Sequence, residues 1–108
     1  MNVIGGNIIG ILQKKDGFTK NELGEKIQAW VDVQSLTGWL DLSAGDSKYT
    51  YNAKLQESTH IFICDYAALD RKADDKRLIV DGIPYDVLLI DDPMGMHRQL
   101  EIYLRFVG

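Results

Sequence analysis

A β-hairpin is encoded most clearly near the end of the chain, where residues 77–91 have the sequence RLIVDGIPYDVLLID. Two apolar runs flank the pair Asp81-Gly82, which favours a type I′ turn because both central residues of that turn take a positive φ. Pro84 has no backbone N–H to donate, so we expect it at a strand end or at a sheet edge. Residues 91–95 (DDPMG) then predict a turn-rich link to the next strand.

Other stretches favour further strands. Residues 99–106 alternate with the period of two that is typical of a half-buried strand. One face of that strand would carry Leu100, Ile102, Leu104 and Phe106. Residues 27–34 alternate in the same way, and residues 39–42 predict a short strand or the continuation of that one. Residues 60–66 (HIFICDY) are apolar at nearly every position, which suits a strand covered on both faces. Residues 7–12 form the remaining candidate.

The segments between these strands are polar. Residues 16–25 predict a turn or a long hairpin loop, and residues 67–76 predict a short charged loop. Residues 43–58 predict a long polar loop with a short helix, which Asp46 or Ser47 would cap. Six or seven short strands separated by turns indicate a mainly β fold, a small antiparallel barrel or sandwich. We expect one domain over residues 1–108, with the loop as an insertion.

Charge and composition narrow the class of protein. The chain has 108 residues, a formal net charge of −4 and a sequence pI near 5.0. A free-standing nucleic-acid binder usually gathers a basic patch, so an acidic balance argues against that class. Cys64 is the only cysteine and cannot form an internal disulfide. The apolar start has no positive region before it, and no apolar run reaches the length of a membrane span. We therefore expect a soluble cytoplasmic protein.

No residues group into a catalytic or metal-binding motif. Neither histidine has the spacing of a metal ligand, so His60 is expected at a strand end and His97 at the surface. Cys64 falls in mid-strand with no adjacent base, which favours a small core side chain over a nucleophile. The acid pairs at residues 74–75 and 91–92 fall in predicted turns, where aspartate supports the backbone. The sequence therefore predicts no enzyme, no cofactor and no metal.

The order of features resembles the phage head-tail joining family, also called head closure, stopper or head-tail connector proteins. An early strand and a loop ending in Gly24-Glu25 precede a segment with two tryptophans, at Trp30 and Trp39. The strand THIFICDY follows the variable polar segment at residues 59–66. The closing pattern of residues 77–104 is the strongest part of the resemblance, which covers nearly the whole chain.

The resemblance implies a structural virion protein, assembled in the bacterial host cytoplasm and encoded by a phage or a prophage element. Copies would form a ring between the portal or adaptor proteins of the DNA-filled head and the tail proteins, although the isolated chain would be monomeric. Double-stranded DNA would pass through the ring without sequence-specific binding. In stopper members of the family a loop from each subunit closes the channel. By its position in the sequence, the segment of residues 43–58 is the candidate for that loop. The channel-loop candidates are Asp46, Lys48, Tyr49, Tyr51, Lys54 and Glu57.

Two alternatives remain open at this point. One is a tail-completion or tail-terminator protein, which also forms a β-rich ring. The other is a nucleic-acid-binding barrel in which Tyr49, Tyr51 and Tyr66 would stack against bases.

Overall fold

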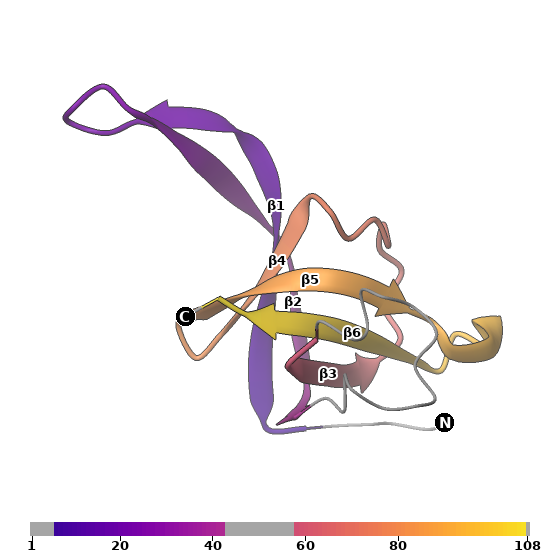
Figure 1. Ribbon diagram of the computed structural model, residues 1–108. Helices are drawn as coiled ribbons and strands as arrows, with labels where there is room; N and C mark the ends of the chain where they lie inside the picture. The colour runs from indigo at the N-terminus through magenta and orange to yellow at the C-terminus, as the bar shows by residue number, and fades with distance from the viewer. Residues whose placement is uncertain (1–5, 43–57, 108) are drawn as a thin grey trace.

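Six antiparallel strands close into a barrel in the computed structural model, which describes residues 6–42 and 58–107 (Figure 1). The strands are β1 (Ile8–Lys20), β2 (Lys26–Leu42), β3 (His60–Asp65), β4 (Lys76–Val80), β5 (Ile83–Asp91) and β6 (Gln99–Phe106). Their order around the barrel is β1-β2-β3-β6-β5-β4, and a 3₁₀ turn, η1 (Pro93–Gly95), links β5 to β6. The predicted mainly β fold is confirmed. None of the described residues belongs to a helix that is long and apolar enough to span a membrane.

The core fills the inside of the barrel. Its fully buried side chains are Leu12, Phe62, Cys64, Leu78, Leu100, Ile102 and Leu104. The predicted alternation of β6 is therefore confirmed, except that Phe106 is 48% exposed because it lies at the strand end. The prediction that β3 is covered on both faces is wrong. Its inward side chains are buried, whereas the outward Ile61 and Ile63 are only half-buried.

The β4–β5 hairpin has the predicted turn. Asp81 has φ 53° and Gly82 has φ 77°, the two positive values that a type I′ turn requires. Pro84 is the second residue of β5 and lies opposite Ile79, and the pairing of β5 with β6 begins only at Tyr85. The missing N–H of the proline is therefore at the strand end, as predicted.

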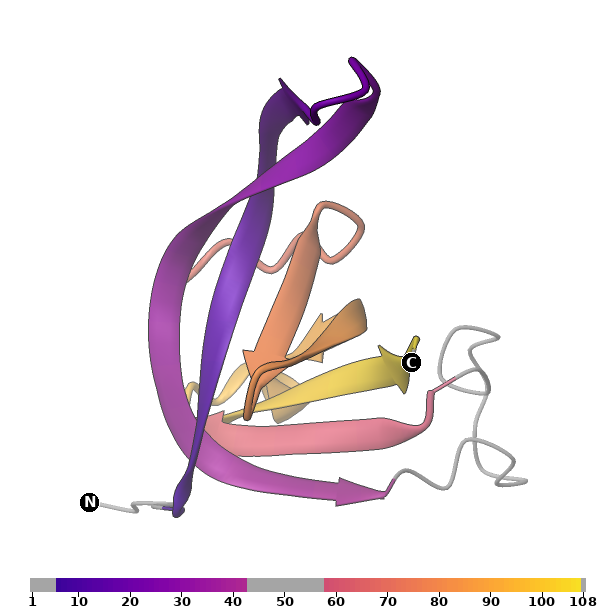
Figure 2. The same cartoon turned by 90° about the vertical axis from the view of Figure 1, so that its left-hand side faces the viewer.

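The β1–β2 hairpin is much longer than the sequence predicts (Figure 2). We expected residues 16–25 to form a loop, but β1 continues to Lys20 and β2 begins at Lys26. The prediction is therefore wrong for residues 16–20, which are strand, and right for residues 21–25, which form the turn of the hairpin. Gly17, with φ 68°, lies in the bulge between the Lys15 and Phe18 pairs, which accounts for the turn-like signal. Residues 39–42 continue β2, one of the two outcomes predicted.

The thiol of Cys64 should be nearly inert in the folded protein. Burial, and then the negative charge of Asp65, raises the pKa of Cys64 to about 11. Because the thiolate is the reactive form, we expect a disulfide reagent at pH 8 to modify native protein far more slowly than urea-unfolded protein. The rate of thiol modification measures this. Equal rates in the two states would contradict the burial of Cys64.

Candidate functional site

The predicted channel-loop residues lie outside the described part of the chain. Asp46, Lys48, Tyr49, Tyr51, Lys54 and Glu57 all fall within residues 43–57. The strands on either side are described, and Leu42 of β2 pairs with His60 of β3. Both ends of the intervening segment are therefore attached at neighbouring positions on the barrel.

Residues around Thr59 fix the end of this segment to the barrel. The Thr59 N–H donates to the Leu104 carbonyl at 2.8 Å, and its Oγ1 accepts from the Phe106 N–H at 2.8 Å. The His60 ring lies edge-on to Tyr85, with 5.0 Å between ring centroids. His60 thus occupies the strand end, as predicted, and takes part in an aromatic cluster that the sequence did not reveal.

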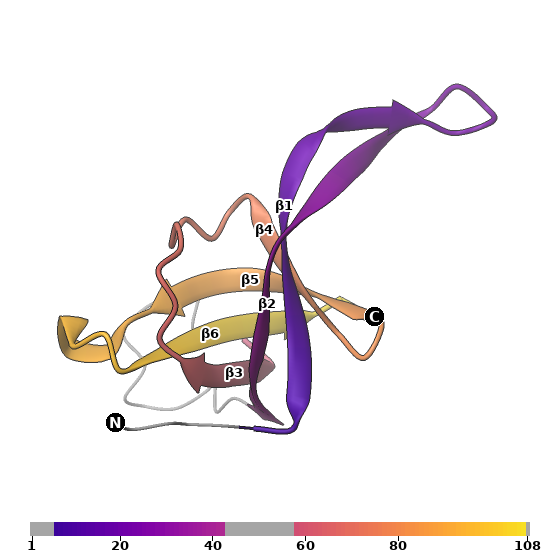
Figure 3. The same cartoon turned by 180° about the vertical axis from the view of Figure 1, so that it is seen from behind.

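A projecting hairpin is the most distinctive surface feature of the described chain (Figures 1 and 3). Strand β1 pairs with β4 only as far as Lys14, and β2 pairs with β3 only from Gly38 onward. Beyond the Lys14–Val31 pair the two strands pair only with each other. We call residues 14–31 the arm. Its exposed apolar side chains are Phe18, Leu23, Ile27 and Val31, which are 65%, 84%, 46% and 45% exposed.

The tip of the arm is an ordered turn held by one asparagine. The Oδ1 atom of Asn21 accepts from the backbone N–H groups of Leu23 and Glu25, both at 2.9 Å. The Gly24 N–H donates to the Asn21 carbonyl at 3.0 Å, and Gly24 has φ 81°, which suits glycine. The tip therefore presents Leu23 to solvent on a fixed backbone.

Side chains at the base hold the arm to the barrel. The Arg77 guanidinium of β4 lies over the Trp30 ring, 4.3 Å from its centroid. The Arg77 Nε also donates to Gln13 Oε1 at 2.8 Å, and Gln13 Nε2 donates to Asp32 Oδ1 at 2.7 Å. The cation stacked on Trp30 links the arm to β4, and the two hydrogen bonds join β4, β1 and β2 next to the arm, which restricts the angle at which it leaves the barrel.

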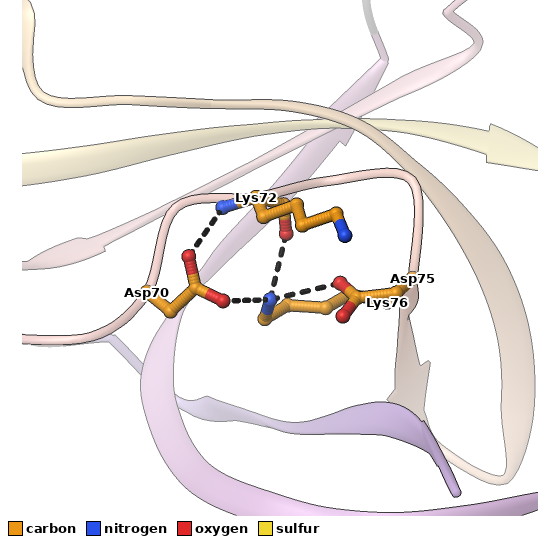
Figure 4. A network of polar contacts seen from close by, with 4 residues as sticks. All are labelled: Asp70, Lys72, Asp75 and Lys76. Carbon is orange, nitrogen blue, oxygen red and sulfur yellow. Dashed lines mark hydrogen bonds and ion pairs between the residues drawn. The ribbon is translucent and has the colours of Figure 1, made fainter. Parts of the chain in front are cut away.

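A buried lysine organises the loop beside this base (Figure 4). The Lys76 side chain is 1% exposed, and its Nζ donates to Asp70 Oδ2, Asp75 Oδ1 and the Lys72 carbonyl at 3.0, 3.0 and 2.7 Å. The Asp75 carbonyl in turn accepts from the Lys15 N–H at 2.9 Å. The network therefore connects the β3–β4 loop to the first residues of the arm.

In this network the pKa of each shifted group changes in the direction that favours its charged form. Hydrogen bonds from the Lys72 N–H and from Lys76 lower the pKa of Asp70, and a hydrogen bond from Lys76 lowers that of Asp75. Burial acts to lower the pKa of Lys76, but hydrogen bonds to Asp75 and Asp70 outweigh it and raise that pKa. The carboxylates stabilise the fold above their unfolded pKa of about 3.9, and the lysine does so below about 10.4. The contribution is lost as pH falls through the lower folded pKa values of the carboxylates.

Replacing Lys76 with methionine should lower the free energy of unfolding by about 1–3 kcal/mol at pH 7, because Asp75 and a carbonyl lose their buried partner. The loss of stability below about pH 4 should also become shallower. Urea unfolding at pH 7 and pH 3 measures both effects. Lys72→Met is the matched control, since Lys72 contributes backbone groups to the network. Equal losses in the two variants would contradict the role given to Lys76.

Asp92 supports the turn in which it was predicted, whereas Asp91 is the last residue of β5. The buried Asp92 carboxylate accepts from the His97 N–H at 3.0 Å and contacts the His97 Nδ1, with Arg71 at 3.6 Å. The ring of Tyr66 lies against that of His97, 4.5 Å between centroids, so Tyr66 is half-buried. Over the residues that the structure covers, no three His, Cys, Asp or Glu side chains gather in a metal-binding group.

The described residues thus define a closed antiparallel β-barrel protein with a projecting arm. The phage head completion protein family matches residues 11–105, and the chain belongs to that family. Membership implies a structural role in head assembly, a place in the virion and contacts with other head and tail proteins, rather than an enzyme's role.

The barrel also resembles a solved structure. The solution structure of protein SF1141 from Shigella flexneri 2a matches with a TM-score of 0.67, covering 100% of this chain and 98% of that chain. The two sequences are 19% identical, so this likeness concerns the fold. No curated protein matches the chain.

Proposed function

We propose that this chain is a subunit of a ring that joins the DNA-filled head, at its portal or adaptor proteins, to the tail. The match of residues 11–105 to the phage head completion family carries this proposal. The ring is structural and carries out no catalytic step. Its neighbours are the portal or adaptor on one side and tail proteins on the other.

The barrel and the arm support a role in assembly. In the closed barrel each described strand has a neighbour on both sides, which limits the strand edges that a partner could extend. Attachment then depends on projecting parts and on the outer face of the wall. Leu23 and Phe18, 84% and 65% exposed on the arm, are apolar side chains of the kind that mark contact surfaces between proteins.

The net charge of the chain suits a ring through which DNA moves. The chain has a net charge of −4, and copies arranged in a ring would repel the phosphate backbone at short range. Weak phosphate contacts allow DNA to slide through the ring. Residues 43–58 close the channel in the assembled ring, through Asp46, Lys48, Tyr49, Tyr51, Lys54 and Glu57. The pairing of Leu42 with His60, which anchors both ends of this segment, supports that assignment.

A null mutation in the phage or prophage that encodes the chain tests the proposed function. Electron microscopy of lysates should show full-size heads, separate tails and loss of DNA from heads, and the full-length gene in trans should restore tailed particles. Filled heads that keep their DNA and attach normal tails would contradict the proposal. Tails of abnormal length on normal heads would instead indicate a tail-terminator protein.

A further inference from the structure

One face of the arm is basic and apolar. Its cross-strand pairs are Lys15–Trp30, Phe18–Gln28 and Lys20–Lys26, and these residues form the arm's basic face. The Lys26 ammonium lies 5.9 Å from the centroid of the exposed Phe18 ring, so the two side chains share this face. Two lysines directly opposite each other are unfavourable in isolation. Neither Lys20 nor Lys26 forms an ion pair with any described residue.

The outer face of the barrel carries the opposite charge over strands β2, β3, β6 and β5. The inward side chains of β3, β5 and β6 are buried, and on β2 Leu36 is buried and Leu40 half-buried, so the residues between them face outward. Strand pairing places them in two rows, Asp41–Ile61–Tyr103–Leu89 and Trp39–Ile63–Glu101–Asp91. We call these eight residues the acidic wall. They include three carboxylates and no basic side chain.

The carboxylates of the acidic wall lie close to its apolar centre. Glu101 accepts from the Tyr103 hydroxyl at 3.2 Å. Asp91 lies opposite Glu101 across the β5–β6 pairing. Burial, and then the charges of Glu101 and Asp91, raise the pKa of Tyr103. Trp39 is 48% exposed beside them. The acidic wall therefore offers apolar side chains and negative charge in one surface.

The two surfaces do not meet within one chain. The arm projects away from β3, β5 and β6 in every view (Figures 1, 2 and 3). The stretch from Lys14 to Lys20 extends roughly 20 Å at the rise of a β-strand, enough to reach a neighbouring molecule. Contact between unlike surfaces of identical chains is head-to-tail, and such contacts close rings when the rotation permits.

We propose that the basic face of the arm of one copy docks on the acidic wall of the next copy. This inference rests on the proposed ring and names the contact that closes it. Phe18 packs on the apolar side chains around Ile61 and Ile63. Lys20 and Lys26 then face the carboxylates of Asp41 and Glu101. DNA is the less favoured partner for the arm, because phosphates give the exposed Phe18 no apolar contact.

Exchanging the charges of the arm and of the acidic wall, in the virus, tests this contact. The arm variant is Lys20→Glu with Lys26→Glu, the wall variant is Asp41→Lys with Glu101→Lys, and a third variant combines all four changes. Each protein is supplied in trans to the null mutant, and infectious tailed particles are counted. Lys72→Glu with Arg98→Glu is the control for the arm variant. It makes the same change in charge at exposed positions outside both surfaces. Thermal unfolding of each purified variant checks that it folds.

The arm and wall variants should each lower the titre at least about tenfold, and the combined variant should recover most of it. Wild-type titres for both the arm variant and the wall variant would overturn the proposed contact. A loss of titre that the combined variant does not repair would overturn it too. Salt-sensitive binding of duplex DNA by wild-type protein, abolished in the arm variant, would overturn it in favour of DNA. If the null mutant itself completes heads normally, the proposed function fails, which is a distinguishable result.

Carbodiimide cross-linking of purified virions gives a direct readout, because the reagent joins lysine ammonium groups to nearby carboxylates. Mass spectrometry should find Lys20 or Lys26 linked to Asp41 or Glu101. These pairs do not approach each other within one chain, so such links join two copies. Links from these lysines only to other virion proteins would overturn the proposal.

Discussion

Replacing Phe62 with alanine is expected to lower the free energy of unfolding by about 3–5 kcal/mol, the usual cost of removing a buried aromatic ring. Phe62 is fully buried on β3 and pairs on either side with Leu40 and Ile102. Since small domains are stable by about 5–15 kcal/mol, this loss would remove much of the total.

Urea unfolding followed by circular dichroism measures the effect, with Phe18→Ala as the matched control. Phe18 is 65% exposed on the arm and contributes nothing to the barrel core, so its removal should change stability by about 0.5 kcal/mol or less. Similar losses for the two variants would contradict the placement of the core inside the barrel.

Substituting Gly38 with alanine should cost about 3 kcal/mol, at the upper end of the usual range for overpacking. A Cβ atom at Gly38 would lie 2.2 Å from the Ile63 carbonyl oxygen and 2.9 Å from Cys64 Cβ. The first of these atoms is backbone in β3, so relief requires the two paired strands to separate. The close approach of β2 to β3 at this point therefore depends on glycine.

Gly10→Ala is the control for Gly38→Ala. The three atoms nearest to a Cβ at Gly10 would all belong to the Leu78 side chain, at 3.1–3.2 Å, and a side chain can shift where backbone cannot. The loss should therefore be clearly smaller than at Gly38. Equal urea midpoints for the two variants would mean that the β2–β3 contact is looser than the structure shows.

Local signals explain which parts of the fold the sequence predicts. The β4–β5 hairpin was predicted because Asp81-Gly82 specifies its turn and apolar residues fill both strands. Strand β6 was predicted because one face is buried, which imposes a period of two. The β1 half of the arm was missed because Lys15 to Lys20 are exposed on both faces, so they carry no such period although they lie in a strand. Its β2 half falls in residues 27–34, which the alternation does predict as a strand.

The candidate surfaces depend on contacts distant in sequence. Ile61 of β3 lies beside Tyr103 of β6, and Tyr103 lies beside Leu89 of β5, so the acidic wall exists only once the strand order is known. The buried Lys76 was read as part of a solvated charged loop, since its partners Asp70 and Asp75 look like ordinary surface acids. The assignment of residues 43–58 to the channel rests on position in the chain and stays a prediction.

Cryo-electron microscopy of the virion connector tests the central claim most directly. We expect density for this closed six-stranded barrel, repeated as a ring around the DNA channel between the portal and the tail. Residues 43–58 should lie toward the channel axis. A barrel located elsewhere in the particle, or virions that lack the protein, would contradict the proposed ring between head and tail.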